Sequence, residues 1–116
     1  MPVHYLPGDA RSIPGISPAE AWQRMQDEGA TLIDVREPEE FAEGHAEGAV
    51  SIPLSVFRER HQEIPPDGDL LVICHVGQRS LMAAIFLRNQ GREHVFNVDG
   101  GTDSWEAMRL PMQYPS

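Results

Sequence analysis

The only cysteine of the chain, Cys74, stands where an apolar segment ends, and a glycine, an arginine and a serine follow it within six residues. A thiolate is a strong nucleophile, and its pKa falls at the start of a helix because backbone N–H groups and the helix dipole stabilise its charge. Glycine lets the connecting loop adopt a positive φ, and the guanidinium of Arg79 can bind an oxyanion through two parallel hydrogen bonds. A lone cysteine is often only a packing residue. This setting instead favours a nucleophile held in a nest of backbone N–H groups.

The segments around Cys74 predict the frame that positions it. Residues 70–74 (LLVIC) are all apolar, which is typical of a central parallel strand buried on both faces. Residues 80–90 predict a helix directly behind the loop. Elsewhere, strands are expected at 31–35, 49–54 and 94–98, and helices at 16–29, 37–44, 55–64 and 102–110. Alternation of strands and helices predicts an α/β domain with a mainly parallel central sheet and helices on both faces.

Capping residues mark several of the expected boundaries. Ser17 and Glu20 have the spacing of a capping box at the start of the first helix. Ser80 is predicted to be the N-cap of the helix behind the Cys74 loop. Pro111 and Pro115 predict a loose C-terminal tail.

Composition and charge restrict the class of protein. The 116 residues fit one domain, and 41% apolar with 23% charged residues is typical of a soluble globular protein. The net charge of −9 argues against nucleic acid and anionic membrane surfaces as partners. We expect no secretory or membrane-spanning segment, and a single cysteine fits a reducing, cytoplasmic setting. Sparse aromatic residues favour a monomer, and the absence of lysine excludes Schiff-base chemistry.

Three stretches of the chain together resemble one known family, the rhodanese-like sulfurtransferases. CHVGQRS (74–80) resembles the family's active-site loop, and LIDVREPEEFAEGHAEGAVSIP (32–53) resembles its Asp-Val-Arg and Gly-His segments. VFNVDGGTDSW (95–105) resembles its closing Gly-Gly…Trp segment. The stretches occur in the family's order. The resemblance covers roughly residues 12–112, the expected core of a single rhodanese-like domain spanning 1–116.

The resemblance implies a sulfur-transfer reaction. Cys74 would take a sulfane sulfur from a donor such as thiosulfate, carry it as a persulfide, and pass it to cyanide or a thiol. A protein that bears a persulfide is a second possible donor. No metal or organic cofactor is implied. The residues expected to bind the substrate are those of the loop: His75, Val76, Gly77, Gln78 and Arg79.

Supporting roles are expected for a few neighbours of the loop. The resemblance implies that Asp34 braces the loop and that Arg36 joins a charge network at its rim. A plain structural ion pair is the alternative for these two residues. His75 is expected either to contact the substrate or to point into solvent, and His45 to be a structural hydrogen-bonding residue.

The sequence leaves three other kinds of function as alternatives. Cysteine phosphatases and arsenate reductases of related fold place five residues between cysteine and arginine, whereas four intervene between Cys74 and Arg79 here. A catalytically idle binding module of the same family typically lacks the cysteine, which this chain retains. A redox-sensing thiol would need a partner cysteine from another molecule. Because Arg79 is the one fixed positive charge of the loop, the hypothesis follows that thiosulfate, a dianion, is a poor donor and a protein persulfide the natural one.

Overall fold

The central sheet has five parallel strands, and the strand that leads to Cys74 lies in its middle. The structure is a computed structural model that describes residues 13–115, so residues 1–12 and 116 of the predicted domain lie outside the described part. The strands follow the order β1 (Gly15–Ile16), β6 (Val95–Val98), β5 (Leu70–Ile73), β2 (Thr31–Asp34) and β4 (Val50–Ser51). Every neighbouring pair is parallel, which confirms the predicted α/β class.

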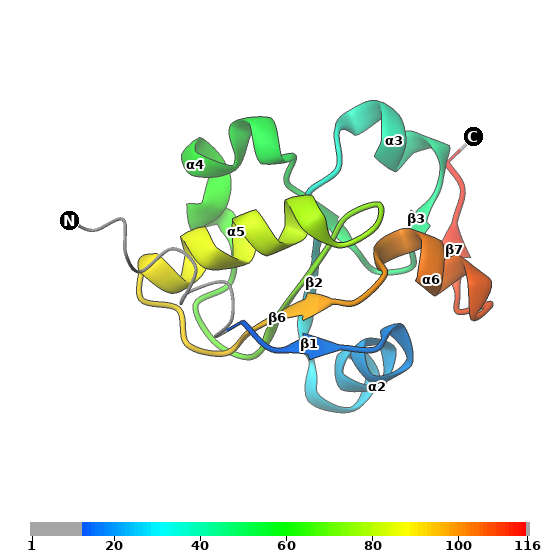
Figure 1. The fold of residues 1–116 in the computed structure, drawn as a ribbon, viewed down its shortest axis with the longest axis horizontal. Coiled ribbons are helices and arrows are strands. Elements are labelled where there is room, and N and C mark those ends of the chain that lie inside the picture. Colours follow the sequence, from blue (N-terminus) through cyan, green and yellow to red (C-terminus); the bar gives the residue numbers. More distant parts are fainter. Residues whose placement is uncertain (1–12, 116) are drawn as a thin grey trace.

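Helices cover both faces of this sheet, as predicted (Figure 1). On one face, α5 (Gln78–Asn89) and α4 (Phe57–Arg60) pack into a first hydrophobic core. On the other face, α2 (Pro18–Glu28) and α6 (Gly101–Ala107) enclose a second core. Within residues 13–115, no helix combines the length and the apolar character needed to cross a bilayer.

Strand β5 supplies side chains to both cores, which explains its continuous apolar sequence. Successive residues of a strand point to opposite faces. Leu70, Val72 and Cys74 accordingly lie in the core under α5, and Leu71 and Ile73 in the core under α2 and α6. Cys74 is therefore the last residue of a buried series that faces the α5 side.

The start of α2 agrees in part with the prediction made from the sequence. The Ser17 side chain accepts a hydrogen bond from the backbone N–H of Glu20 (3.1 Å), as an N-cap should. The Glu20 carboxylate binds Arg24 (2.6 Å) rather than completing the predicted capping box. A reciprocal box forms instead in α3 (Pro38–Glu43), between Glu37 and Glu40.

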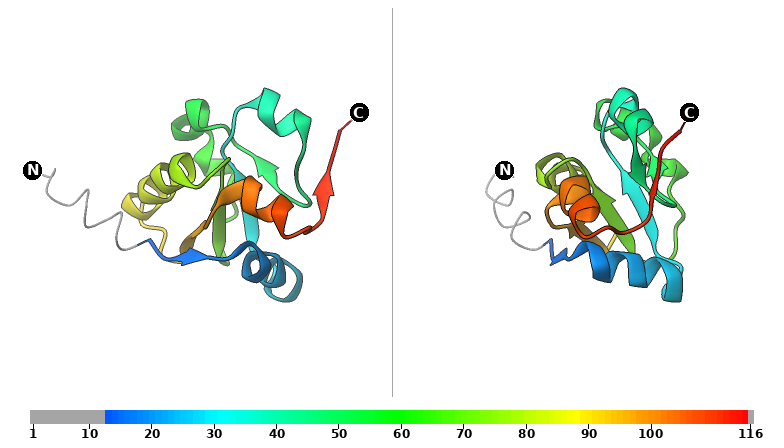
Figure 2. Two further views of the ribbon diagram at one scale, coloured as in Figure 1. Left: turned by 45° about the vertical axis from the view of Figure 1, so that its right-hand side comes forward. Right: turned by 90° about the vertical axis from the view of Figure 1, so that its right-hand side faces the viewer.

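Several short elements differ from the sequence prediction. Residues 55–64 are not one helix: α4 is flanked by 3-10 turns at Leu54–Val56 and His61–Glu63. The expected loose tail contains strand β7 (Met112–Gln113), which pairs antiparallel with β3 (His45–Ala46) beside α6 (Figure 2). Strands of two residues such as these are too short to produce a recognisable alternation of apolar and polar residues.

Candidate active site

The loop that follows β5 curls around the sulfur of Cys74. The loop ends at Gly77, which has a φ of +111° and is the N-cap residue of α5. A side chain at this φ would be strained, so glycine is required for the curl. The prediction that Ser80 is the N-cap is wrong, since α5 begins two residues earlier. Ser80 is buried in the first turn of α5, and its hydroxyl lies 3.3 Å from the Cys74 Sγ.

The surroundings of Sγ stabilise a thiolate. Cys74 is 1% exposed, and burial alone raises the pKa of its thiol. Hydrogen bonds from the Ser80 hydroxyl and from the backbone N–H groups of Ser80, Gly77 and Val76 lower it. The Gly77 N–H, for example, donates to Sγ at 3.0 Å. These bonds outweigh burial, so the pKa of Cys74 lies below its ordinary value.

The N–H groups of the loop face inward because neighbouring elements hold its carbonyl groups outward. The Cys74 carbonyl accepts from the Thr102 N–H (2.8 Å) and hydroxyl (3.1 Å), at the start of α6. The next carbonyl, of His75, accepts from the Asp103 N–H (3.2 Å). Helix α6 can approach this closely because Gly101 has no side chain: a Cβ there would lie 2.4 Å from the carbonyl oxygens of both Cys74 and His75.

Asn97 on β6 joins the loop to the buried hydroxyl of Ser80. Its amide nitrogen donates to the Gly77 carbonyl (3.2 Å), and its oxygen accepts from the Ser80 hydroxyl (2.5 Å). Asn97 and Thr102 are not among the site residues predicted from the sequence. A usable signal for Asn97 was present, because it is an amide inside an otherwise apolar strand.

Asp34 and Arg36 form a buried ion pair at the end of β2, next to the loop. Asp34 is 0% and Arg36 6% exposed, and the guanidinium Nη2 lies 2.9 Å from Asp34 Oδ2. The same Nη2 donates to the Gly44 carbonyl (2.8 Å). All the hydrogen bonds described for the Asp34 carboxylate come from Arg36, so the structure favours the ion-pair alternative over a direct brace to the loop. Removing one partner of such a buried pair typically costs about 3–5 kcal/mol.

Arg79 is paired across the mouth of the loop with Glu40 of α3. Its two terminal nitrogens donate to the two carboxylate oxygens, each at 2.8 Å. This guanidinium lowers the pKa of Glu40 to about 2, although partial burial opposes the shift. The Glu37 N–H, 3.0 Å from the Glu40 carboxylate, lowers it further. The arginine expected to bind an oxyanion is therefore held by a carboxylate of the protein itself.

The remaining predicted residues lie on the outer surface of the loop or beside it. Val76 and Gln78 are at least partly exposed, and His75 is exposed, with its Nε2 2.9 Å from the Asp103 carboxylate. A hollow of about 190 Å³ borders the loop on the His75 side. His45 is the structural residue that was expected: its Nδ1 lies 2.9 Å from the Phe41 carbonyl oxygen.

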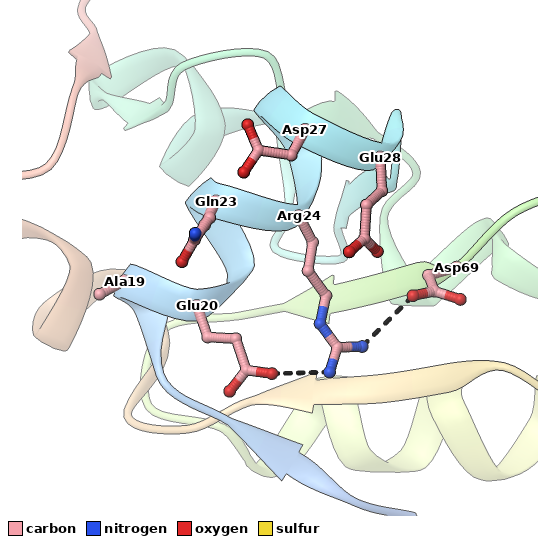
Figure 3. A pocket seen from close by; sticks show the side chains of 7 residues that line it. All are labelled: Ala19, Glu20, Gln23, Arg24, Asp27, Glu28 and Asp69. Carbon is pink, nitrogen blue, oxygen red and sulfur yellow. Dashed lines mark hydrogen bonds and ion pairs between the residues drawn. The ribbon is translucent and has the colours of Figure 1, made fainter.

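A second hollow, of about 690 Å³, is remote from this chemistry (Figure 3). It lies along α2, where Arg24 is drawn between Glu20 and Asp69. Asp69 comes just before β5, whereas Cys74 follows the other end of that strand. Arg24 binds Glu20 on its own helix and Asp69 before β5, so the cluster links α2 to the start of that strand.

Comparison with known proteins agrees with this geometry. The family model described as Rhodanese-like domain matches residues 17–108. The chain belongs to the rhodanese-like domain family. It is 36% identical over 98 residues to the thiosulfate sulfurtransferase GlpE of Actinobacillus pleuropneumoniae, covering 84% of this chain and 91% of that protein. It is 37% identical over 94 residues to a sulfurtransferase of Allochromatium vinosum, covering 80% of this chain and 88% of that one.

A solved structure of a rhodanese-like relative has the same fold. The rhodanese-related protein of Thermoplasma volcanium superposes with a TM-score of 0.79 at 32% identity, covering 86% of this chain and 97% of that one. The resemblance of the three sequence stretches to rhodanese-like sulfurtransferases is thereby confirmed. Because several relatives of the chain are sulfurtransferases, sulfur transfer is the activity to test at this site.

Proposed function

We propose that the protein is a sulfurtransferase that carries a sulfane sulfur as a persulfide on Cys74. The main support for this proposal is the buried thiol of Cys74, whose pKa is lowered by hydrogen-bond donors directed at Sγ. An inward ring of N–H groups stabilises an anion, and both the thiolate and the persulfide are anions. The sulfurtransferase relatives give the proposal its reaction class.

The reaction has two half-steps that use the same loop. In the first, the Cys74 thiolate attacks the outer sulfur of thiosulfate, the S–S bond of the donor breaks, and sulfite leaves with the bonding electrons. In the second, cyanide or a thiolate attacks the outer sulfur of the persulfide, and Cys74 leaves as the thiolate. Because Cys74 is almost completely buried, only a donor with a projecting terminal sulfur can reach Sγ.

Each residue near Cys74 has a role in this scheme. Gly77, Val76 and Ser80 donate hydrogen bonds to the sulfur, while His75, Gln78 and Arg79 lie around the entrance through which a donor must pass. Asn97 and Thr102 position the loop, and the pair of Asp34 with Arg36 fixes the end of β2 beside it. None of these four residues touches the substrate.

The four-residue spacing between Cys74 and Arg79 supports sulfur transfer over phosphate chemistry. The longer loop of the related phosphatases encloses a tetrahedral phosphate, and the shorter loop here suits a smaller sulfur group. An idle binding module would have no need for a thiol with a lowered pKa. Retention of the cysteine therefore supports an enzyme over a docking domain.

Sulfite release and thiocyanate formation test the proposal. Mixing the reduced protein with thiosulfate alone should release about one sulfite per protein molecule, and adding cyanide should convert the reaction to steady turnover. The folded Cys74→Ser variant should do neither. Hydrolysis of an aryl phosphate, with no sulfite release from thiosulfate, would overturn the proposal in favour of a phosphatase.

A further inference from the structure

The basic side chains beside Cys74 are each matched by a carboxylate. Arg79 lies 2.8 Å from Glu40, and the guanidinium of Arg36 and the imidazole of His75 have acidic partners in the same way. The whole chain carries a net charge of −9. Local positive potential at the loop mouth is therefore weak, although a donor such as thiosulfate carries two negative charges.

Glu40 occupies the two N–H donors with which Arg79 would otherwise bind an oxyanion. A guanidinium holds a carboxylate, sulfonate or phosphate best through two parallel N–H donors. Both terminal nitrogens of Arg79 are already bonded to the two oxygens of Glu40, at 2.8 Å each. Thiosulfate oxygens can take this two-point contact only by displacing the carboxylate.

Glu40 is itself fixed before any substrate arrives. As the third residue of α3, it accepts the Glu37 backbone N–H at 3.0 Å and so completes the capping box of that helix. The carboxylate is thus held by the cap in addition to Arg79, so displacing it costs the cap as well as the ion pair. A mobile surface glutamate would not exclude an anion in this way.

We propose that Glu40 determines donor specificity: by occupying Arg79, it makes the Cys74 loop favour a thiol persulfide, which reacts in its neutral form RS–SH, over dianionic thiosulfate. This inference rests on the proposed sulfur transfer. With a persulfide RS–SH, the Cys74 thiolate attacks the outer sulfur, the S–S bond breaks, and RS⁻ leaves and takes the proton, so that the products are the Cys74 persulfide anion and RSH. No sulfonate group needs a cation in this reaction.

The test compares two donors on matched variants. Glu40→Gln removes the charge but keeps a side chain that can still complete the capping box. Glu39→Gln makes the same change of charge at the neighbouring, exposed residue of α3. The donors are thiosulfate and the persulfide of N-acetylcysteine methyl ester, whose only ionisable group is the persulfide. The readout is the second-order rate constant of sulfur loading on Cys74, followed by intact-protein mass spectrometry.

We expect Glu40→Gln to raise the ratio of the thiosulfate to the persulfide rate constant by about tenfold, because the freed guanidinium gains charge-assisted hydrogen bonds to thiosulfate. Glu39→Gln should leave this ratio at the wild-type value. This increase in the ratio should be absent in the double variant that combines Glu40→Gln with Arg79→Gln. Its absence would show that Glu40 acts through Arg79.

Two failures can be told apart. If Cys74 is loaded but the donor ratio is the same in wild type and Glu40→Gln, the specificity inference is wrong while sulfur transfer stands. If neither donor loads Cys74 in any variant, although the thiol still reacts with iodoacetamide, the proposed function itself is wrong. A purely structural role of Glu40 would lower stability without changing the ratio.

Discussion

At the scale of single residues, the chemistry of Cys74 depends on a balance between burial and hydrogen bonding. Burial raises the pKa of the thiol, and the donors around Sγ lower it by more. The Ser80 hydroxyl has one proton for two acceptors, the sulfur at 3.3 Å and the Asn97 oxygen at 2.5 Å. When Cys74 is ionised, this proton can be directed at the sulfur, which makes Ser80 the side chain that most directly favours the thiolate.

Ser80→Ala should raise the pKa of Cys74, because the thiolate loses a donor and stays buried. We expect alkylation by iodoacetamide near neutral pH to slow by about 3- to 10-fold, with the midpoint of the pH–rate profile moving upward. The rate at high pH, where the thiol is ionised in both proteins, should be similar. Ser55→Ala, which removes an exposed hydroxyl that donates to Glu37 and not to Sγ, is the control. An unchanged profile would show that the backbone N–H groups alone set the pKa.

At the scale of elements, helix α6 determines the shape of the loop. Its first residues bind the carbonyls of Cys74 and His75, and this contact requires the absence of a side chain at Gly101. Gly101 has a φ of +60°, so any substitution also adds backbone strain. A second glycine is needed to separate the strain from the loss of contact.

Gly91 provides that comparison, with a φ of +97° and no atom within 4 Å of the position that a Cβ would occupy. Gly91→Ala should cost only the backbone strain, about 1–2 kcal/mol in urea unfolding. Gly101→Ala should cost more, because α6 must move away from the loop, and should also lower the rate of sulfur loading on Cys74. Equal activity in the two variants would contradict a role of α6 in shaping the loop.

The ion pair between α3 and α5 predicts a specific loss of stability in acid. The pKa of Glu40 is lowered to about 2 in the folded protein from an ordinary value of 4.5. Its contribution to the free energy of unfolding is therefore present above pH 4.5 and is lost as the pH falls toward 2. For a pair about one-third exposed, we expect a contribution of about 1 kcal/mol after solvent screening.

Urea unfolding at several pH values between 5 and 2 measures this contribution. The loss of stability on acidification should be smaller in Glu40→Gln than in wild type, by the same ~1 kcal/mol. Glu39→Gln should follow the wild-type curve. Identical acid profiles for wild type and Glu40→Gln would show that the pair with Arg79 does not persist in solution.

Local signals in the sequence were sufficient for some of these features and not for others. The apolar run before Cys74 and the glycine and arginine after it located the site, because the end of a strand, a turn and a helix start are local features. The pairing of Arg79 with Glu40 joins residues 39 apart, and the reach of Asn97 to Ser80 spans 17. Such contacts depend on how α3, β6 and α5 pack. Ser80 was misassigned because the positive φ of Gly77 places the helix start two residues earlier.

At the scale of the whole molecule, the net charge of −9 opposes the approach of any anionic donor. Salt screens this repulsion, with a Debye length that falls from about 30 Å at 10 mM to about 8 Å at 150 mM. Loading of Cys74 by thiosulfate should therefore become a few-fold faster over this range. Alkylation by uncharged iodoacetamide should change little. A thiosulfate reaction that slows with salt would show that a local cation, and not the overall field, controls donor capture.

Intact-protein mass spectrometry shows directly whether Cys74 carries a persulfide. The reduced protein is measured before and after incubation with thiosulfate and, separately, with the persulfide of N-acetylcysteine methyl ester, beside the folded Cys74→Ser variant. We expect wild type to gain one sulfur atom, to lose it on addition of cyanide, and the variant to gain none. No gain from either donor, in a protein whose Cys74 is still alkylated by iodoacetamide, would contradict sulfur transfer by this site.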